Sequence, residues 1–166
     1  MTIHNEILAT HPEYLEPLAA GFHFDLRSEG STGDPDEVTF NRVPVFSYFD
    51  GRLSCRFNVE SIKDVMVKAS EPLQGLALES VEAVADLAHR PDIRYDMECQ
   101  QGDIQILNNY SILHARGGFE DHPEHERRRN LLRLWVNLHN GRKLEPRFAD
   151  RLNTGPRGGV FVTDAA

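Results

Sequence analysis

The segment 129–138 constrains the fold more than any other part of the chain, because its side chains sort into two different faces. Successive side chains of a β-strand point to opposite sides, so every second residue shares a face. One face is entirely apolar and consists of Leu132, Leu134, Val136 and Leu138. The other face carries Arg129, Leu131, Arg133 and Trp135. An apolar face must pack inward against a second layer, so the segment predicts a strand in a layered β architecture.

A tight β-hairpin is predicted around Asp50-Gly51. The residues before it alternate through Val45, Ser47 and Phe49, and after it Leu53, Cys55 and Phe57 alternate with Arg52, Ser54 and Arg56. Asp-Gly between two alternating runs favours a two-residue turn, because both central positions need positive φ.

Helical periodicity marks the regions on both sides of this hairpin. Before it, the stripe Ile3, Ile7, Leu8, Tyr14, Leu15 and Leu18 predicts two short helices that end at Gly21. Thr10 and Glu13 fit a capping box between them, and Pro12 is tolerated in a first turn. After it, two helices are predicted from the sets Val59, Ile62, Met66 and Leu78, Val81, Ala85, Ala88. The polar run 28–37 predicts a surface loop.

Strands return in the second half of the chain, at 93–99, 103–107, 111–116, 130–138 and 159–162. Strands, then a helical insertion, then more strands favour a β-sandwich or jelly-roll decorated by helices over regular βαβ winding. The prediction is therefore a mainly β fold with helical insertions (α+β), built as one domain over residues 1–166.

Charge and composition limit the classes of partner that the protein is expected to bind. The formal net charge of −8 leaves no basic field for nucleic acid or for an anionic membrane surface. Cys55 and Cys99 are the only cysteines and have no CxxC spacing, so they form no disulfide framework. The N-terminus does not resemble a secretory signal, and no apolar run is long enough to cross a bilayer. We expect a cytoplasmic protein that binds neither nucleic acid nor membrane.

One histidine and two arginines are the candidates for chemistry. His114 lies in the predicted strand 111–116, while Arg129 and Arg133 share one face of the strand 129–138. A guanidinium held in a sheet needs an anionic partner, and its planar fork suits a carboxylate. Facing one cavity, these residues would suit a metal with a dicarboxylate. A plainer interpretation is a structural histidine and a solvated arginine face, and the spacing alone favours this one.

A longer motif favours the metal and dicarboxylate site over this plainer interpretation. The string His114-Ala-Arg-Gly-Gly-Phe-Glu-Asp121, followed by Arg128-Arg-Asn-Leu-Leu-Arg-Leu-Trp135, resembles the C-terminal signature of TauD/TfdA-type dioxygenases. The tail Thr154-Gly-Pro-Arg-Gly-Gly159 resembles that family too, as do the Gly102-Asp103 strand and the 46–56 hairpin. The resemblance covers most of the chain and implies a double-stranded β-helix, also described as a jelly-roll.

The resemblance also implies a reaction and its cofactors. In this family two histidines and one carboxylate hold Fe(II) and leave positions for 2-oxoglutarate and O₂. A small organic substrate is hydroxylated while 2-oxoglutarate is decarboxylated to succinate. Carried over by position, His114 is the distal iron-binding histidine and Arg129 pairs with the far carboxylate of 2-oxoglutarate. Arg133 lies near that carboxylate or the substrate. No catalytic residue beyond the metal site is implied.

The match breaks at the other two iron ligands. The family's His-x-Asp pair precedes the helix that begins this chain, so we expect residues 1–166 to be the C-terminal portion of the domain, with an incomplete β-helix. A literal His23-Phe24-Asp25 occurs, but its surroundings resemble a later strand of the family and its distance from His114 is short. We interpret it as a coincidence. His122 and His125 predict a solvated loop rather than a second metal site.

Three interpretations remain open at this point. One imidazole cannot hold Fe(II) usefully, and missing strands expose sheet edges. The leading interpretation is a fragment of a dioxygenase: either the sequence is truncated, or a second copy or another chain completes the sheet and the site. The second is a non-catalytic remnant that binds a small carboxylate or a partner through its open edge. The third is a cupin-like sugar or metal binder that shares only the jelly-roll.

Overall fold

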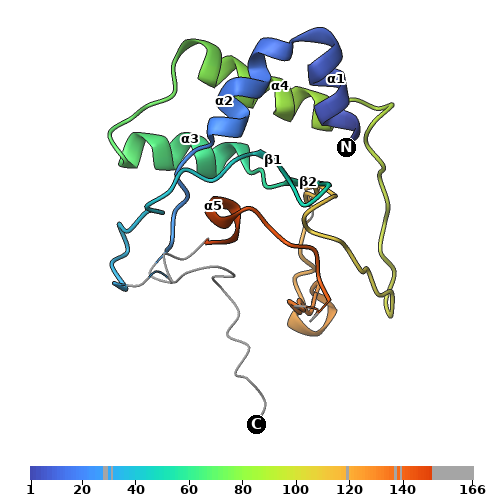
Figure 1. Cartoon of the computed structure of the whole chain (residues 1–166). Coiled ribbons are helices and arrows are strands. Elements are labelled where there is room, and N and C mark those ends of the chain that lie inside the picture. Colours follow the sequence, from blue (N-terminus) through green and yellow to red (C-terminus); the bar gives the residue numbers. More distant parts are fainter. Residues whose placement is uncertain (28–29, 31, 119, 137, 139, 151–166) are drawn as a thin grey trace.

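The computed structural model of the chain describes residues 1–27, 30, 32–118, 120–136, 138 and 140–150. Its helices are α1 (Thr2–Thr10), η1 (Pro12–Tyr14), α2 (Leu15–Ala20), α3 (Val59–Lys68), α4 (Gly75–His89), η2 (His125–Arg127) and α5 (Pro146–Ala149). Its strands are β1 (Phe46–Phe49) and β2 (Arg52–Cys55). Figure 1 shows α1, α2 and α4 gathered on one side, with α5 on the other side of α3 and the hairpin. Among the described residues, no helix is both long and apolar enough to cross a membrane.

The predicted helices are confirmed, with one correction at a helix end. The first two end at Gly21, whose φ of +84° terminates α2. The capping box of Thr10 and Glu13 is wrong, because the Thr10 hydroxyl donates 2.8 Å back to the Glu6 carbonyl within α1. Asn58 does cap a helix, since its side chain accepts 3.0 Å from the Ser61 N–H at the start of α3.

The predicted hairpin is confirmed. β1 and β2 pair antiparallel with Phe49 opposite Arg52, which leaves Asp50 and Gly51 as the two turn residues. Both have positive φ, +49° and +73°, as a two-residue turn of this kind requires. The hairpin therefore forms where local turn chemistry placed it.

A single core joins the helices to the hairpin. Its fully buried side chains come from both halves of the chain and include Ile7, Leu18, Phe22, Val43, Val45, Ile62, Met66, Val81, Val84 and Phe148. Isolated bridges at Phe22–Val43 and Asp25–Val38 connect the chain after α2 to the stretch before β1. Phe148 brings α5 into this core although it lies more than fifty residues beyond α4.

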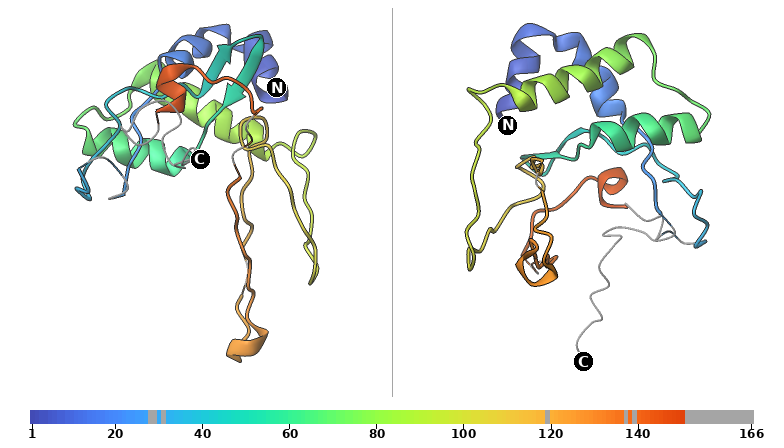
Figure 2. Two further views of the ribbon diagram at one scale, coloured as in Figure 1. Left: turned by 60° about the horizontal axis from the view of Figure 1, so that its bottom comes forward. Right: turned by 180° about the vertical axis from the view of Figure 1, so that it is seen from behind.

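Two extended segments leave this core and return to it (Figure 2, left). We refer to residues 94–109 as the first arm and to the described part of 114–141 as the second arm. Many apolar side chains of both arms are exposed: Ile104 is 86% exposed, Ile106 90%, Leu132 88% and Leu134 87%. The second arm carries the short helix η2 within an otherwise extended path.

The strands predicted over 93–99, 103–107, 111–116 and 130–138 are wrong for the described residues, in which the only paired strands are β1 and β2. A strand exists only as part of a hydrogen-bonded ladder. The backbone bonds of the arms are instead local turns, such as Asp103 N–H to the Gln100 carbonyl at 3.1 Å. Regular structure among the described residues is therefore mostly helical, with one two-stranded hairpin, as in part of a larger fold; the double-stranded β-helix stays a prediction. The strand predicted at 159–162 lies outside the described residues.

Candidate functional site

A pocket of about 410 Å³ lies beside His114, between the end of the hairpin, the start of α3 and the two arms. Its polar lining residues are Asp25, Arg27, Arg56, Asn58, Ser61, Asn109 and His114. Its apolar lining residues are Phe24, Phe57, Ile112, Leu113 and Trp135, and Cys55 completes the wall. A cavity of this size, in which polar groups converge beside apolar side chains, is large enough for a small molecule.

Backbone contacts fix the wall on which His114 lies. The Cys55 N–H, at the end of β2, donates 2.8 Å to the Tyr110 carbonyl. The side-chain oxygen of Asn108 accepts 3.1 Å from the Tyr110 N–H, and its carbonyl accepts from two further N–H groups, including that of Ile112 at 3.1 Å. This turn holds the stretch that leads into His114 against the hairpin.

The predicted site residues are only partly brought together. His114 lines the pocket, whereas Arg129 and Arg133 are exposed on the second arm and are not part of its wall. Trp135, which shares strand parity with both arginines, does reach the pocket. A single cavity for His114, Arg129 and Arg133 therefore stays a prediction.

The literal His23-Phe24-Asp25 pair is engaged elsewhere. His23 Nδ1 lies 2.7 Å from the Thr39 carbonyl, and His23 does not line the pocket. Asp25 does line it, but its Oδ1 accepts 2.9 Å from the Arg27 N–H and lies 3.4 Å from Lys68 Nζ. No group of three or more histidine, cysteine or acidic side chains within the described ranges could hold a metal ion. By themselves, these residues do not fit the three-ligand iron site that the family resemblance implies.

Sequence reasoning missed two cationic residues of the pocket, Arg27 and Arg56. Arg56 belongs to the polar residues of the alternating run after Asp50-Gly51. That pattern predicted only that it lies on one face of a strand. Arg27 lies two residues after Asp25 and has a φ of +49°. Neither residue carries a motif, so only the tertiary arrangement reveals that they share a wall with His114.

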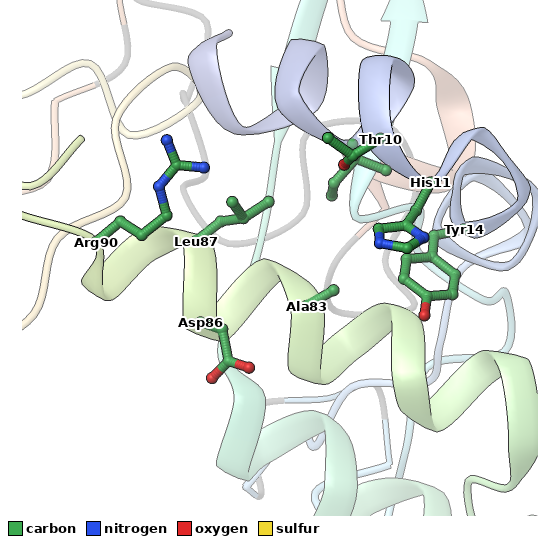
Figure 3. Close-up of a pocket in the computed structure, with 8 residues that line it drawn as sticks. Thr10, His11, Tyr14, Ala83, Asp86, Leu87 and Arg90 are labelled. Atoms are coloured by element: carbon green, nitrogen blue, oxygen red, sulfur yellow. The ribbon is translucent and has the colours of Figure 1, made fainter. Parts of the chain in front are cut away.

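A second pocket, of about 330 Å³, lies between the first helices and α4 and shares no lining residue with the first (Figure 3). His11 stacks on Tyr14 there, with ring centroids 4.9 Å apart. Burial, followed by the nearby charge of Glu79, raises the pKa of Tyr14. Two of its polar side chains contact acidic neighbours: Arg90 Nη1 donates 2.8 Å to Glu6, and His11 Nδ1 lies 3.1 Å from Glu13 Oε1. This pocket offers no comparable set of groups for catalysis.

The two cysteines are expected to react very differently with thiol reagents. Burial raises the pKa of the Cys55 thiol to about 12, so almost none of it is thiolate near neutral pH. Cys99 is exposed on the first arm. Treatment of the native chain with iodoacetamide at about pH 8, near the ordinary thiol pKa, should modify Cys99 alone, as read by peptide mass spectrometry. Cys99→Ser should abolish labelling and Cys55→Ser should leave it unchanged; equal labelling of both thiols would contradict the burial of Cys55.

Comparison with known proteins places the chain in a family. It is 34% identical over 149 residues to FR-33289 synthase of Streptomyces rubellomurinus, a match that covers 86% of this chain and 42% of that protein. It is 32% identical over 136 residues to the taurine hydroxylase-like protein SAT17 of Stachybotrys chartarum, covering 80% of this chain and 33% of that protein. The chain thus spans less than half the length of these relatives. The model of the taurine catabolism dioxygenase TauD, TfdA family matches residues 1–135, and the chain therefore belongs to that family.

Proposed function

We propose that residues 1–166 form the C-terminal portion of an Fe(II)/2-oxoglutarate-dependent dioxygenase domain that hydroxylates a small organic substrate. The observation that carries this proposal is the family match, which extends over residues 1–135 and so includes His114, Arg129 and Arg133. Members of this family generally use Fe(II) and 2-oxoglutarate, which supply the oxidising chemistry when bound. The protein's part is to bind these groups and the substrate and to orient them toward one another within a shielded pocket.

Each proposed role follows from the chemistry of the side chain. His114 offers an imidazole nitrogen at the wall of a pocket large enough for a small molecule. Arg129 and Arg133 lie four residues apart, so a strand conformation would place both guanidinium groups on one face. Arg129 is assigned to the far carboxylate of 2-oxoglutarate, because a guanidinium binds a carboxylate through two parallel hydrogen bonds. Arg133 is assigned to that carboxylate or to the substrate.

The exposed arms support the view that further polypeptide completes the domain. Burying a leucine or isoleucine side chain is worth about 1.5–3 kcal/mol, and several such side chains of the arms face solvent. Extended segments without a ladder also leave backbone groups ready to pair with another strand. More than half of the length of each relative lies outside its match to this chain. We assign to the equivalent polypeptide both the partner strands for the arms and the two remaining iron ligands.

The proposal is tested by anaerobic titration with Fe(II) and 2-oxoglutarate, followed by the charge-transfer absorption of the chelate. The chain is titrated together with a separate polypeptide that comprises the part of FR-33289 synthase outside the match. We expect the absorption band to form in this mixture and to be lost in His114→Ala. Arg129→Ala should raise the concentration of 2-oxoglutarate required by about tenfold or more, the loss expected for one hydrogen-bonded charge pair.

Two controls decide the outcome. Arg116→Ala changes an exposed arginine of the same arm to which we assign no role, and it should leave the band unchanged. A band that survives His114→Ala would contradict the assignment of the iron ligand. A requirement for 2-oxoglutarate that is raised equally by Arg116→Ala and Arg129→Ala would contradict the carboxylate site.

A further inference from the structure

We propose that Arg142 is a positioning residue for His114: its guanidinium holds the stretch that leads into His114 against β2 and so sets where the imidazole stands on the pocket wall. This inference rests on the proposed function, because it takes His114 as the iron ligand. It goes further by assigning a role to a residue outside the stretch 1–135 that the family model matches. The assignment therefore comes from the contacts of the folded chain.

The guanidinium of Arg142 joins two separate segments of the chain. Its Nη1 donates 2.8 Å to the Leu53 carbonyl and 3.2 Å to the Ser54 hydroxyl, both in β2. Its Nη2 donates 2.8 Å to the Ser111 hydroxyl. Arg142 is half-buried and Ser54 is only 4% exposed, so part of this contact is shielded from water. A guanidinium with donors fixed in a planar fork can serve both segments at once, whereas a lysine ammonium is a compact point charge.

The contact uses the edge of the hairpin that faces away from β1. Leu53 and Cys55 are two residues apart in β2, so their backbone groups point to the same edge. On that edge the Cys55 N–H donates 2.8 Å to the Tyr110 carbonyl, and the Leu53 carbonyl accepts from Arg142. The guanidinium therefore takes the place that the N–H of a third strand would take.

The stretch fixed in this way leads directly into His114. Ser111 lies three residues before His114, and the two residues between them line the pocket. His114 itself is exposed, so its position depends on the backbone that precedes it. That backbone is anchored to β2 at Tyr110 by a main-chain bond and at Ser111 through Arg142. Anchors on two successive residues fix the direction of the chain as well as its place. Groups that orient a metal ligand from behind typically change metal affinity about 10–100-fold when they are removed.

The first measurement is made on the metal-free 166-residue chain and reads the order parameter of each histidine ring from the ¹³C relaxation of labelled imidazole. His114→Ala identifies the His114 signal. His89 of α4, whose Nδ1 lies 2.7 Å from the Ala85 carbonyl, is the internal reference. We expect Arg142→Gln and Ser111→Ala to lower the order parameter of His114 by about 0.2 or more, the difference between rigid and flexible groups. His89 should not change.

Further variants separate this contact from general stability. Lys143→Gln is the matched control, because it removes a positive charge one residue away, from an exposed side chain whose Nζ lies 3.8 Å from Asp50 Oδ2. It should behave like the parent chain. Ser111→Thr keeps the hydroxyl and should also keep the parent value. Arg142→Gln combined with Ser111→Ala should lower the value no further than Arg142→Gln alone, since both remove one contact. Ser111 is exposed, so Ser111→Ala keeps the test valid if Arg142→Gln disturbs the hairpin.

The second measurement uses the mixture with the complementary polypeptide and follows the charge-transfer band. Arg142→Gln and Ser111→Ala should raise the dissociation constant of Fe(II) about tenfold or more, while the 2-oxoglutarate required at saturating Fe(II) should stay within about twofold. A general loss of structure would instead raise both quantities together.

A His114 order parameter that keeps the parent value in Ser111→Ala overturns the inference, as does an equal fall in Lys143→Gln or a parallel fall of His89. An Fe(II) dissociation constant that Ser111→Ala leaves unchanged, or a 2-oxoglutarate requirement that rises in step with it, overturns it as well. If no band forms in the mixture with the parent chain, the dioxygenase proposal fails. The order parameters then decide by themselves whether Arg142 positions the stretch that leads into His114.

Discussion

Gly21→Ala is expected to lower the free energy of unfolding by about 2–6 kcal/mol, adding backbone strain to steric overlap. Gly21 ends α2 with φ +84° and ψ −180°, a conformation that side chains disfavour. A Cβ there would lie 2.5 Å from both the carbonyl carbon and oxygen of Val43. Those are backbone atoms of the Phe22–Val43 bridge, which cannot give way without breaking its hydrogen bonds of 2.8 and 3.1 Å. The whole free energy of unfolding of a native protein is only about 5–15 kcal/mol, so this loss is a large fraction of it.

Gly33→Ala is the matched control for this prediction. Gly33 also has positive φ, +71°, but no atom lies within 4 Å of its would-be Cβ. Gly33→Ala should therefore lower the free energy of unfolding only by the strain of a left-handed backbone, about 1–2 kcal/mol. Urea unfolding of the parent chain and both variants, followed by circular dichroism at a helical wavelength, gives the comparison. Equal losses in the two variants would show that the close approach to Val43 contributes nothing.

The 166-residue chain by itself is expected to form succinate from 2-oxoglutarate no faster than its His114→Ala variant. The described residues offer one candidate iron ligand where the family's chemistry requires three, and no described cluster could hold the metal. The measurement is succinate formation by the purified chain with Fe(II), ascorbate and 2-oxoglutarate. His114→Ala sets the background rate, and the effect of adding the complementary polypeptide should exceed any difference between the two.

The rival is that His23 and Asp25 complete the site. Iron–ligand bonds of about 2.0–2.2 Å, as in comparable metal sites, would require both side chains to leave their partners. His23 would turn from the Thr39 carbonyl at 2.7 Å, and Asp25 from Lys68 at 3.4 Å. Turnover by the chain alone that exceeds His114→Ala and is lost in both His23→Ala and Asp25→Ala would establish this rival and refute the incomplete site.

Sequence predicted the features that depend on neighbouring residues. The turn at Asp50-Gly51 forms because positive φ at both positions is a local property of those residue types. The four main helices follow apolar stripes at helical spacing, and α3 begins at a residue able to cap it. The capping box at Thr10 failed for a local reason too, since that hydroxyl bonds to the carbonyl one turn earlier instead.

Sequence could not predict what depends on partners. The alternating run around Leu132 and Leu134 has the period of a strand, but period alone supplies no neighbouring strand, and both residues remain exposed. The same holds for the site. His114 was identified from a motif, whereas its neighbour Arg56 is brought near only because the Cys55 N–H reaches the Tyr110 carbonyl across more than fifty residues. Arg129 and Arg133 are exposed and do not line the pocket, so their place beside His114 stays a prediction.

The way the arms are tethered has a consequence for conformational entropy. Arg142 donates 2.8 Å to the Leu53 carbonyl and 2.8 Å to the Ser111 hydroxyl, so it ties the base of the second arm to both the hairpin and the turn between the arms. A segment fixed at both ends samples far fewer arrangements than a free tail of equal length. If further polypeptide pairs with the arms as proposed, much of the ordering cost of strand pairing has already been met, which strengthens association without adding a single contact.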